Sequence, residues 1–101
     1  MIIEGFAANH NIKLDGKTLS PAHSLKVFNH SPTGFNWGYG GSGPAQLALA
    51  ILLTTTIEDK AIRLYQDFKW QYVNPLPFNK DFKVEIDVEQ WIKEKCEELK
   101  L

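Results

Sequence analysis

The feature that most constrains the fold is a glycine-rich segment that runs directly into an apolar one. Four of the seven glycines lie at positions 38–43, and residues 44–53 that follow carry no charge. Pro44 suits the first turn of a helix, because its missing N–H would have no partner there and its φ is already helical. The pattern therefore predicts a helix from about Pro44 to about Leu53 that is buried on all sides.

A glycine loop that enters a helix can bind an anion, because the first N–H groups of the helix are unpaired and the helix dipole is positive there. Residues 38–43 match the G-x-G-x-x-G pattern, but a chain of 101 residues is too short for the parallel βαβ units of a dinucleotide-binding fold. Pro44 also stands where a Walker loop has its lysine. Two interpretations remain: a ligand-binding loop, or a structural turn that packs the helix against a sheet.

Length and charge limit the range of functions. We expect a single domain over residues 1–101. Eleven basic and twelve acidic residues argue against extended nucleic acid as a partner, and the only arginine, Arg63, leaves few bidentate phosphate contacts. The single cysteine, Cys96, fits a reducing compartment. Without a signal peptide or a membrane-length apolar run, we expect a soluble cytoplasmic protein with no membrane partner.

The N-terminal third predicts a small antiparallel sheet. Residues 1–8 contain enough apolar residues for a short strand. Ile12–Leu14 and Lys17–Leu19 predict a hairpin, because Asp15-Gly16 between them suits the positive φ values of a type I′ turn. The apolar segment Leu25–Phe28 is expected to be a further strand.

The C-terminal half predicts two amphipathic helices separated by a strand. The first opens near Thr56 and stops at Asn74-Pro75, the strand covers residues 82–86, and the last helix is capped by Asp87 and Gln90. Their expected buried faces are Ala61, Ile62, Tyr65, Phe68 and Tyr72 in one helix, and Val88, Trp91, Ile92 and Leu99 in the other. The fold class is therefore α+β: a small antiparallel N-terminal sheet followed by a buried central helix and two amphipathic helices.

Aromatic residues interleaved with the glycines suit a nucleobase that stacks beside a bound phosphate. In this interpretation the N–H groups of Gly40–Gly43 hold phosphate, Trp37 or Tyr39 stacks on the base, and polar side chains contact sugar or phosphate. Lys69 and Lys26 are the best available cations. The candidate ligand-binding residues are Asn29, His30, Trp37, Tyr39, Gly40, Gly41, Ser42, Gly43 and Lys69.

Simpler interpretations compete at two of these positions. Phe68 and Trp70 at a helix end would ordinarily pack into the core and leave Lys69 outside. A hydrolase that used His30 and Ser42 would need an orienting carboxylate, which no neighbouring residue supplies. Three histidines and one cysteine give no metal-ligand spacing. We therefore expect no catalytic residues, no metal and no cofactor.

The segments Asn29-His30-Ser31-Pro32, 34–52 and 64–77, taken together, resemble a family of small bacterial and phage domains of unknown function, with the match spanning about residues 12–92. The resemblance implies a phage or mobile-element setting, where short proteins often counter host defence. With the glycine–aromatic loop, it suggests a non-enzymatic homo-oligomer in the host cytosol that sequesters a nucleotide-type immune signal, either a cyclic nucleotide or an ADP-ribose derivative. The alternative is a protein-interaction module that inhibits a host defence protein or complex, in which the loop is purely structural.

Overall fold

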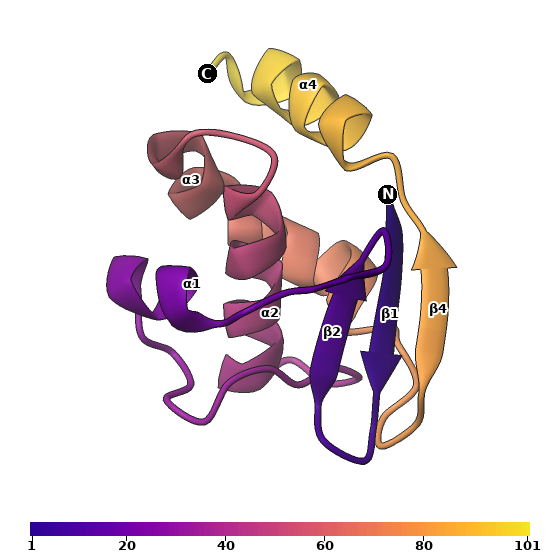
Figure 1. The fold of residues 1–101 in the computed structure, drawn as a ribbon. Helices are drawn as coiled ribbons and strands as arrows, with labels where there is room; N and C mark the ends of the chain where they lie inside the picture. The colour runs from indigo at the N-terminus through magenta and orange to yellow at the C-terminus, as the bar shows by residue number, and fades with distance from the viewer.

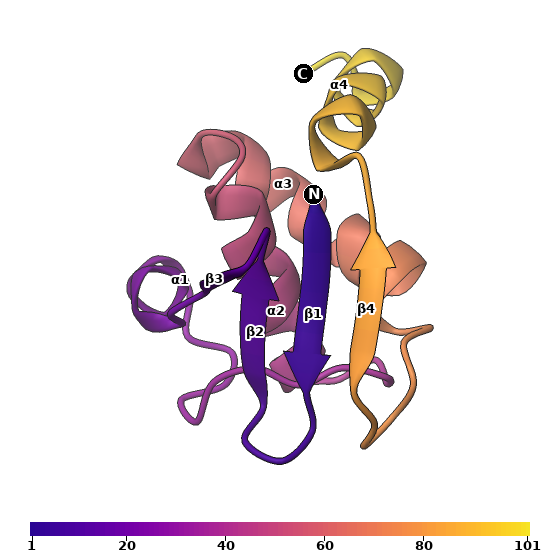
Figure 2. The ribbon, with the colours of Figure 1, turned by 45° about the vertical axis from the view of Figure 1, so that its right-hand side comes forward.

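Four antiparallel strands in the order β3-β2-β1-β4 form one sheet, and helices pack against one of its faces (Figures 1 and 2). The computed structural model describes all residues 1–101. The elements are β1 (Ile2–Phe6), β2 (Asn11–Leu14), β3 (Lys17–Thr18), α1 (Ala22–Val27), α2 (Ser42–Leu53), α3 (Glu58–Phe68), the π-helix η1 (Lys69–Val73), β4 (Phe82–Glu85) and α4 (Val88–Leu99). The predicted α+β class is confirmed.

The sheet is built around β1, which pairs with both β2 and β4. The predicted hairpin is confirmed: Leu14 pairs with Lys17, and Asp15 and Gly16 between them have φ values of 50° and 83°. On β1, Glu4 pairs with Lys13 on one side and with a further lysine of β4 on the other. These charges suit a sheet face that water reaches, while Ile3 faces the core.

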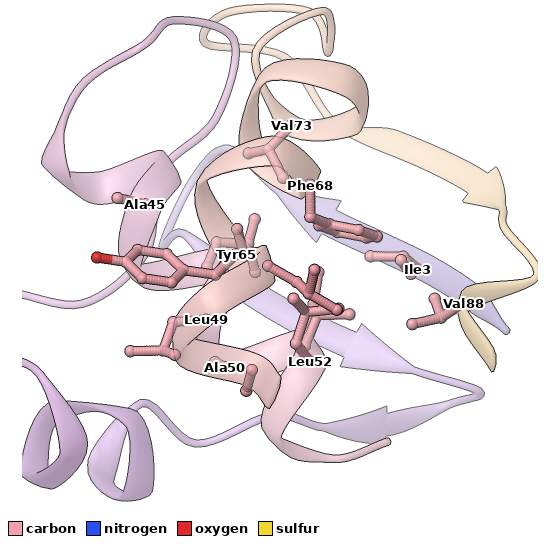
Figure 3. Packing of buried hydrophobic residues seen from close by; sticks show 14 of the residues in the cluster. Ile3, Ala45, Leu49, Ala50, Leu52, Tyr65, Phe68, Val73 and Val88 are labelled. Atoms are coloured by element: carbon pink, nitrogen blue, oxygen red, sulfur yellow. The ribbon is translucent and has the colours of Figure 1, made fainter. Parts of the chain in front are cut away.

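Helix α2 is the centre of the molecule, as the apolar run predicts. Every residue from Gly43 to Leu52 is buried. Helix α2 packs beside α3, and Figure 2 shows it behind the sheet. Leu49 and Leu52 of α2 lie in one apolar cluster with Phe68 of α3 and Ile3 of β1 (Figure 3). The helix begins at Ser42, two residues before Pro44.

The amphipathic faces of α3 and α4 are confirmed except at one residue in each, and Tyr72, which lies in η1, is half-buried. Ala61, Tyr65 and Phe68 are buried, but Ile62 is 39% exposed, because it lies one residue off the stripe of positions spaced by three and four. Leu99 is 47% exposed because it is the last residue of α4, beyond the buried stripe of Val88, Trp91 and Ile92.

The predicted strand at Leu25–Phe28 is wrong, because Leu25 to Val27 belong to a helix that begins at Ala22. Ser20 Oγ accepts a hydrogen bond from the Ala22 N–H at 3.2 Å, and Ser24 Oγ donates to the Pro21 carbonyl at 2.9 Å. The first bond satisfies an N–H that would otherwise be unpaired in a first turn, and the Pro21 carbonyl also accepts the Leu25 N–H at 3.0 Å. The residues up to Val27 therefore form α1, and Phe28 returns to an extended conformation with φ of −156°.

The expected arrangement at the end of α3 is also reversed. Phe68 is buried as predicted, but Lys69 is only 6% exposed and Trp70 is 57% exposed. Lys69 follows Tyr65 by four positions, which places it on the buried face of the helix. Beyond it the helix continues as a π-turn, in which the Asn74 N–H donates to the Lys69 carbonyl at 2.8 Å.

Candidate ligand-binding cleft

A cleft of 480 Å³ opens at the N-terminus of α2. It lies between the turn that joins β1 to β2 and the segment 31–36 that leads to the glycine loop. Its polar side chains are Asn9, His10, Ser31, Thr33, Asn36 and Ser42. No charged side chain lines this cleft. A neutral, hydrogen-bonding cleft at the positive end of a helix can accept an anion.

The backbone at this end of α2 leaves hydrogen-bond donors open. Gly41 precedes the helix and provides no side-chain cap, and the first turn contains no acidic residue. The Ala45 N–H donates to the Gly41 carbonyl at 3.2 Å. In contrast, the N–H groups of Ser42 and Gly43, which line the cleft, donate to no group of the chain.

Tyr39 forms the aromatic side of the cleft, and two glycines make room for it. A Cβ added to Gly41 would overlap the Tyr39 ring, and one added to Gly43 would lie 3.2 Å from the Tyr39 hydroxyl oxygen and 2.6 Å from the Asn36 Cβ. Tyr39 is nevertheless 37% exposed. The glycines therefore hold a partly exposed ring against the start of α2.

His10 lies on the other side of the cleft. Its Nδ1 is 3.1 Å from the carbonyl oxygen of Phe35. A carbonyl oxygen only accepts, so Nδ1 carries the proton in this bond, and Nε2 of the neutral ring is left as an acceptor. The ring also packs 5.6 Å from that of Trp37. The bond to the Phe35 carbonyl holds the His10 ring against the segment 31–36, which lines the opposite side of the cleft.

A larger hollow of 630 Å³ lies at the other end of the sheet, below α4, and its lining differs in charge. Four carboxylate side chains contribute to it: Asp15, Glu85, Asp87 and Glu89. Their combined negative charge disfavours a phosphate. The smaller cleft at α2 is therefore the better candidate for an anionic ligand.

Three of the residues selected from the sequence, Tyr39, Ser42 and Gly43, meet in the cleft. Trp37 instead lies in the core with 1% exposure, and its Nε1 donates to the carbonyls of Pro77 and Lys80 at 3.1 and 3.0 Å. Its ring is therefore not available to stack on a ligand. Sequence reasoning missed His10, because the fold alone brings the β1–β2 turn next to α2.

His30 belongs to a separate polar network that fastens the start of the 31–36 segment to the helices. Its Nε2 lies 2.7 Å from the Tyr65 hydroxyl, which points out of the apolar cluster (Figure 3). The N–H groups of His30 and Ser31 donate to Gln46 Oε1 at 2.8 and 3.2 Å, and Gln46 Nε2 donates to Ser24 Oγ at 2.9 Å. Burial, and then the nearby charge of Lys69, lower the pKa of His30 below its usual 6.5.

His30 therefore stabilises the wall of the cleft from behind. No hydrogen bond joins it to Ser42, the nucleophile considered for a hydrolase. Asn29 beside it is exposed, with its side chain in none of the hydrogen bonds of the fold. No three His, Cys, Asp or Glu side chains are grouped as a metal ion would require.

Lys69 contacts the glycine loop from the side of η1. Its Nζ donates to the Gly40 carbonyl at 3.2 Å and lies 4.5 Å from the ring centre of Trp70. The Gly38 N–H donates to the Val73 carbonyl at 3.1 Å. The π-helix η1 thus holds the loop at two points. Lys69 positions the loop and does not line the cleft.

Residues 5–94 match the model of a family of unknown function, DUF6166, and the chain belongs to that family. Comparison with curated proteins and with solved structures found no match for the chain. None of the helices combines the length and the apolar character needed to cross a bilayer.

Proposed function

We propose that this member of the DUF6166 family is a non-enzymatic protein that binds a small phosphorylated ligand of the nucleotide type in the cleft at α2. The observation that carries the proposal is the pair of unpaired N–H groups, on Ser42 and Gly43, at the start of a twelve-residue helix that borders a polar cleft. The cleft volume of 480 Å³ falls within the range of small-molecule sites.

Each group in the cleft has a role in this proposal. The N–H groups of Ser42 and Gly43 hold a phosphate, and the open N–H groups of Gly40 and Gly41 extend the donor set along the loop. The hydroxyl of Ser42 and the side chain of Asn36 bind phosphate or sugar oxygens. Tyr39 provides the aromatic surface for a base.

The biological setting is part of the same proposal. We place the protein in the cytoplasm, encoded by a phage or mobile element, where it sequesters a nucleotide-type immune signal. We also propose a homo-oligomer, because an 11.5 kDa domain encloses a ligand more fully when a second copy covers the open side of the cleft. Size-exclusion chromatography with light scattering, with and without ligand, measures that state.

The test of ligand binding is titration calorimetry against AMP, cyclic mononucleotides, ADP-ribose and inorganic phosphate. We expect binding in the micromolar range that is lost in Ser42→Glu and only weakened in Ser42→Gln, which removes the hydroxyl contact but adds no charge. The two variants have the same shape, and only the first places a negative charge beside the phosphate. Ser42 is exposed, and an acid at a helix start does not weaken the helix, so both variants should fold. If no ligand of the panel binds the parent protein, the proposal is wrong.

One observation favours the alternative of a protein-interaction module. The glycines of the loop are occupied by the protein's own side chains, since Gly40 and Gly41 pack under Trp70 and Tyr39. A pull-down from host lysate distinguishes the two functions. A single stoichiometric protein that is retained by Ser42→Glu would support the interaction module and not the ligand site.

A further inference from the structure

Three aromatic residues are exposed around the glycine loop. Tyr39 is 37%, Phe78 50% and Trp70 57% exposed. Tyr39 belongs to the loop itself, Trp70 to η1 and Phe78 to the segment before β4. The rings of Tyr39 and Phe78 lie 5.6 Å apart at an angle of 36°. We call these three residues the aromatic shelf. Of the three, only Tyr39 lines the cleft.

The aromatic shelf packs closely on the glycines of the loop. A Cβ on Gly40 would lie 2.6 Å from the Trp70 ring, and a Cβ on Gly38 would lie 2.6 Å from the Phe78 Cα. Each aromatic residue thus packs closely on a glycine while part of its ring faces solvent. Exposed aromatic rings bind a flat ligand at low entropic cost, because each ring has only two side-chain torsions to lose.

The charge beneath the shelf favours an anionic ligand. Lys69 is 6% exposed, and no carboxylate lies within 4.0 Å of its Nζ; the single ion pair of the chain joins Lys95 and Glu98. The Gly40 carbonyl accepts one of the three ammonium N–H groups. A buried charge without a counter-ion leaves a positive potential under Trp70 and Gly40.

We propose that the aromatic shelf stacks the two bases of a dinucleotide. One base lies on Tyr39 and Phe78 and the other on Trp70, with the linking phosphate at the open N–H groups of Gly40 and Gly41, above Lys69. Trp70 packs on Gly40 and Tyr39 packs on Gly41, so neighbouring residues of the loop carry the two stacking surfaces. This inference rests on the proposed function and narrows its ligand class, since the cleft beyond Tyr39 holds the terminal phosphate.

Calorimetry with AMP and with the 5′-phosphorylated dinucleotide pApA tests the proposal. We expect the dinucleotide to bind at least about ten-fold more tightly, which is the gain that one additional stacked base provides. Trp70→Ala should abolish this gain and leave the affinity for AMP unchanged, whereas Trp70→Phe should keep part of it. Ile57→Ala, which also removes an exposed apolar side chain, is the control and should bind as the parent does.

Fluorescence gives a second measurement on the parent protein. Trp37 and Trp91 are 1% and 6% exposed, so a ligand that stacks on the surface quenches chiefly Trp70. We expect quenching by pApA that is absent in Trp70→Phe. Thermal unfolding of each variant checks that it is folded.

The possible outcomes separate the two proposals. The shelf proposal is overturned if pApA binds no more tightly than AMP, or if Trp70→Ala binds pApA with the affinity of the parent. In either case the proposal that the cleft binds a phosphorylated ligand still stands. If neither ligand binds and the wider panel also fails, the proposed function itself is wrong. If a six-nucleotide single strand binds more than about ten-fold more tightly than pApA, the shelf binds a strand and not a dinucleotide.

Discussion

The ammonium group of Lys69 donates a hydrogen bond to the carbonyl oxygen of Gly40 across 3.2 Å, although Lys69 is only 6% exposed. Lysine is seldom buried unless it is paired with an opposite charge. Here the partner is the neutral carbonyl group of Gly40, in the glycine loop that precedes α2. The bond connects η1 to that loop and places a positive charge near His30.

The first prediction concerns that charge. Lys69→Met should raise the pKa of His30 towards 6.5 without restoring it fully, because burial is the larger cause of the lowering and Lys69 the smaller. A titration of the His30 ring protons by NMR measures the change. Lys60→Met, a control in the adjoining helix α3, should leave the His30 pKa as it is; equal shifts in both variants would rule out a local effect of Lys69.

The same variant should change stability little. Burial of the Lys69 charge is unfavourable, so its removal in the Met variant stabilises the fold. The variant also loses the hydrogen bond to Gly40, which destabilises the fold. Gly40 is exposed, so water can bond to its carbonyl in the variant. We expect the free energy of unfolding to stay within about 1 kcal/mol of the parent in urea denaturation. A loss of several kcal/mol would contradict this prediction and would mean that the hydrogen bond from Lys69 to Gly40 is essential for stability.

The second prediction is a loss of stability in mild acid. The pKa of His30 is lowered in the folded state, so below pH 6.5 the unfolded chain binds a proton that the folded protein does not. The contribution of His30 is therefore fully present above pH 6.5 and declines as the pH falls towards the folded pKa. Urea denaturation at pH 7.5, 6.5 and 5.5 should show a smaller decline in His30→Gln than in the parent. Parallel curves would contradict the prediction.

The third prediction separates two glycines of the loop. Gly38 has φ of +84°, and an added Cβ would lie 2.6 to 2.8 Å from backbone atoms of Phe78 and Leu76. Gly38→Ala should cost more than about 2 kcal/mol, or roughly 10 °C in Tm. At Gly40 the obstructing group is the exposed Trp70 ring, which can turn away. Gly40→Ala should cost about 1 kcal/mol or less, and an equal loss in both would refute the distinction.

The elements that local sequence determines were predictable. Asp15-Gly16 specifies its turn through positive φ, and the uncharged run after Pro44 specifies a helix that can only be buried. The Asp87 side chain accepts from the Gln90 N–H at 3.0 Å, so the N-cap of α4 is confirmed. The Gln90 side chain does not complete the capping box, because its Nε2 donates to Glu94 Oε1 at 3.0 Å. In each case the deciding interaction lies within a few residues along the chain.

The assignments that depend on packing between distant segments were not predictable. Trp37 and Tyr39 are both aromatic residues next to Gly38, so the sequence does not distinguish them. In the fold, Trp37 donates to the carbonyls of residues 77 and 80, whereas Tyr39 lies at the surface. His10 reaches the cleft only because the β1–β2 turn lies against the segment 31–36. The residue types of Leu25–Phe28 are compatible with a strand. Leu25 to Val27 instead belong to the helix whose N-cap is Pro21, and Ser24 of this helix accepts a hydrogen bond from Gln46 of α2.

The last prediction concerns Gln46, a fully buried glutamine in the otherwise apolar α2. Its side chain accepts from the N–H groups of His30 and Ser31 and donates to Ser24. Gln46→Leu keeps the helix propensity but removes the acceptor of two part-buried N–H groups, which should cost about 2–4 kcal/mol in urea denaturation. Gln66→Leu, at an exposed position of α3, should change stability by less than about 0.5 kcal/mol. If both variants lose the same free energy, Gln46 does not hold the wall of the cleft.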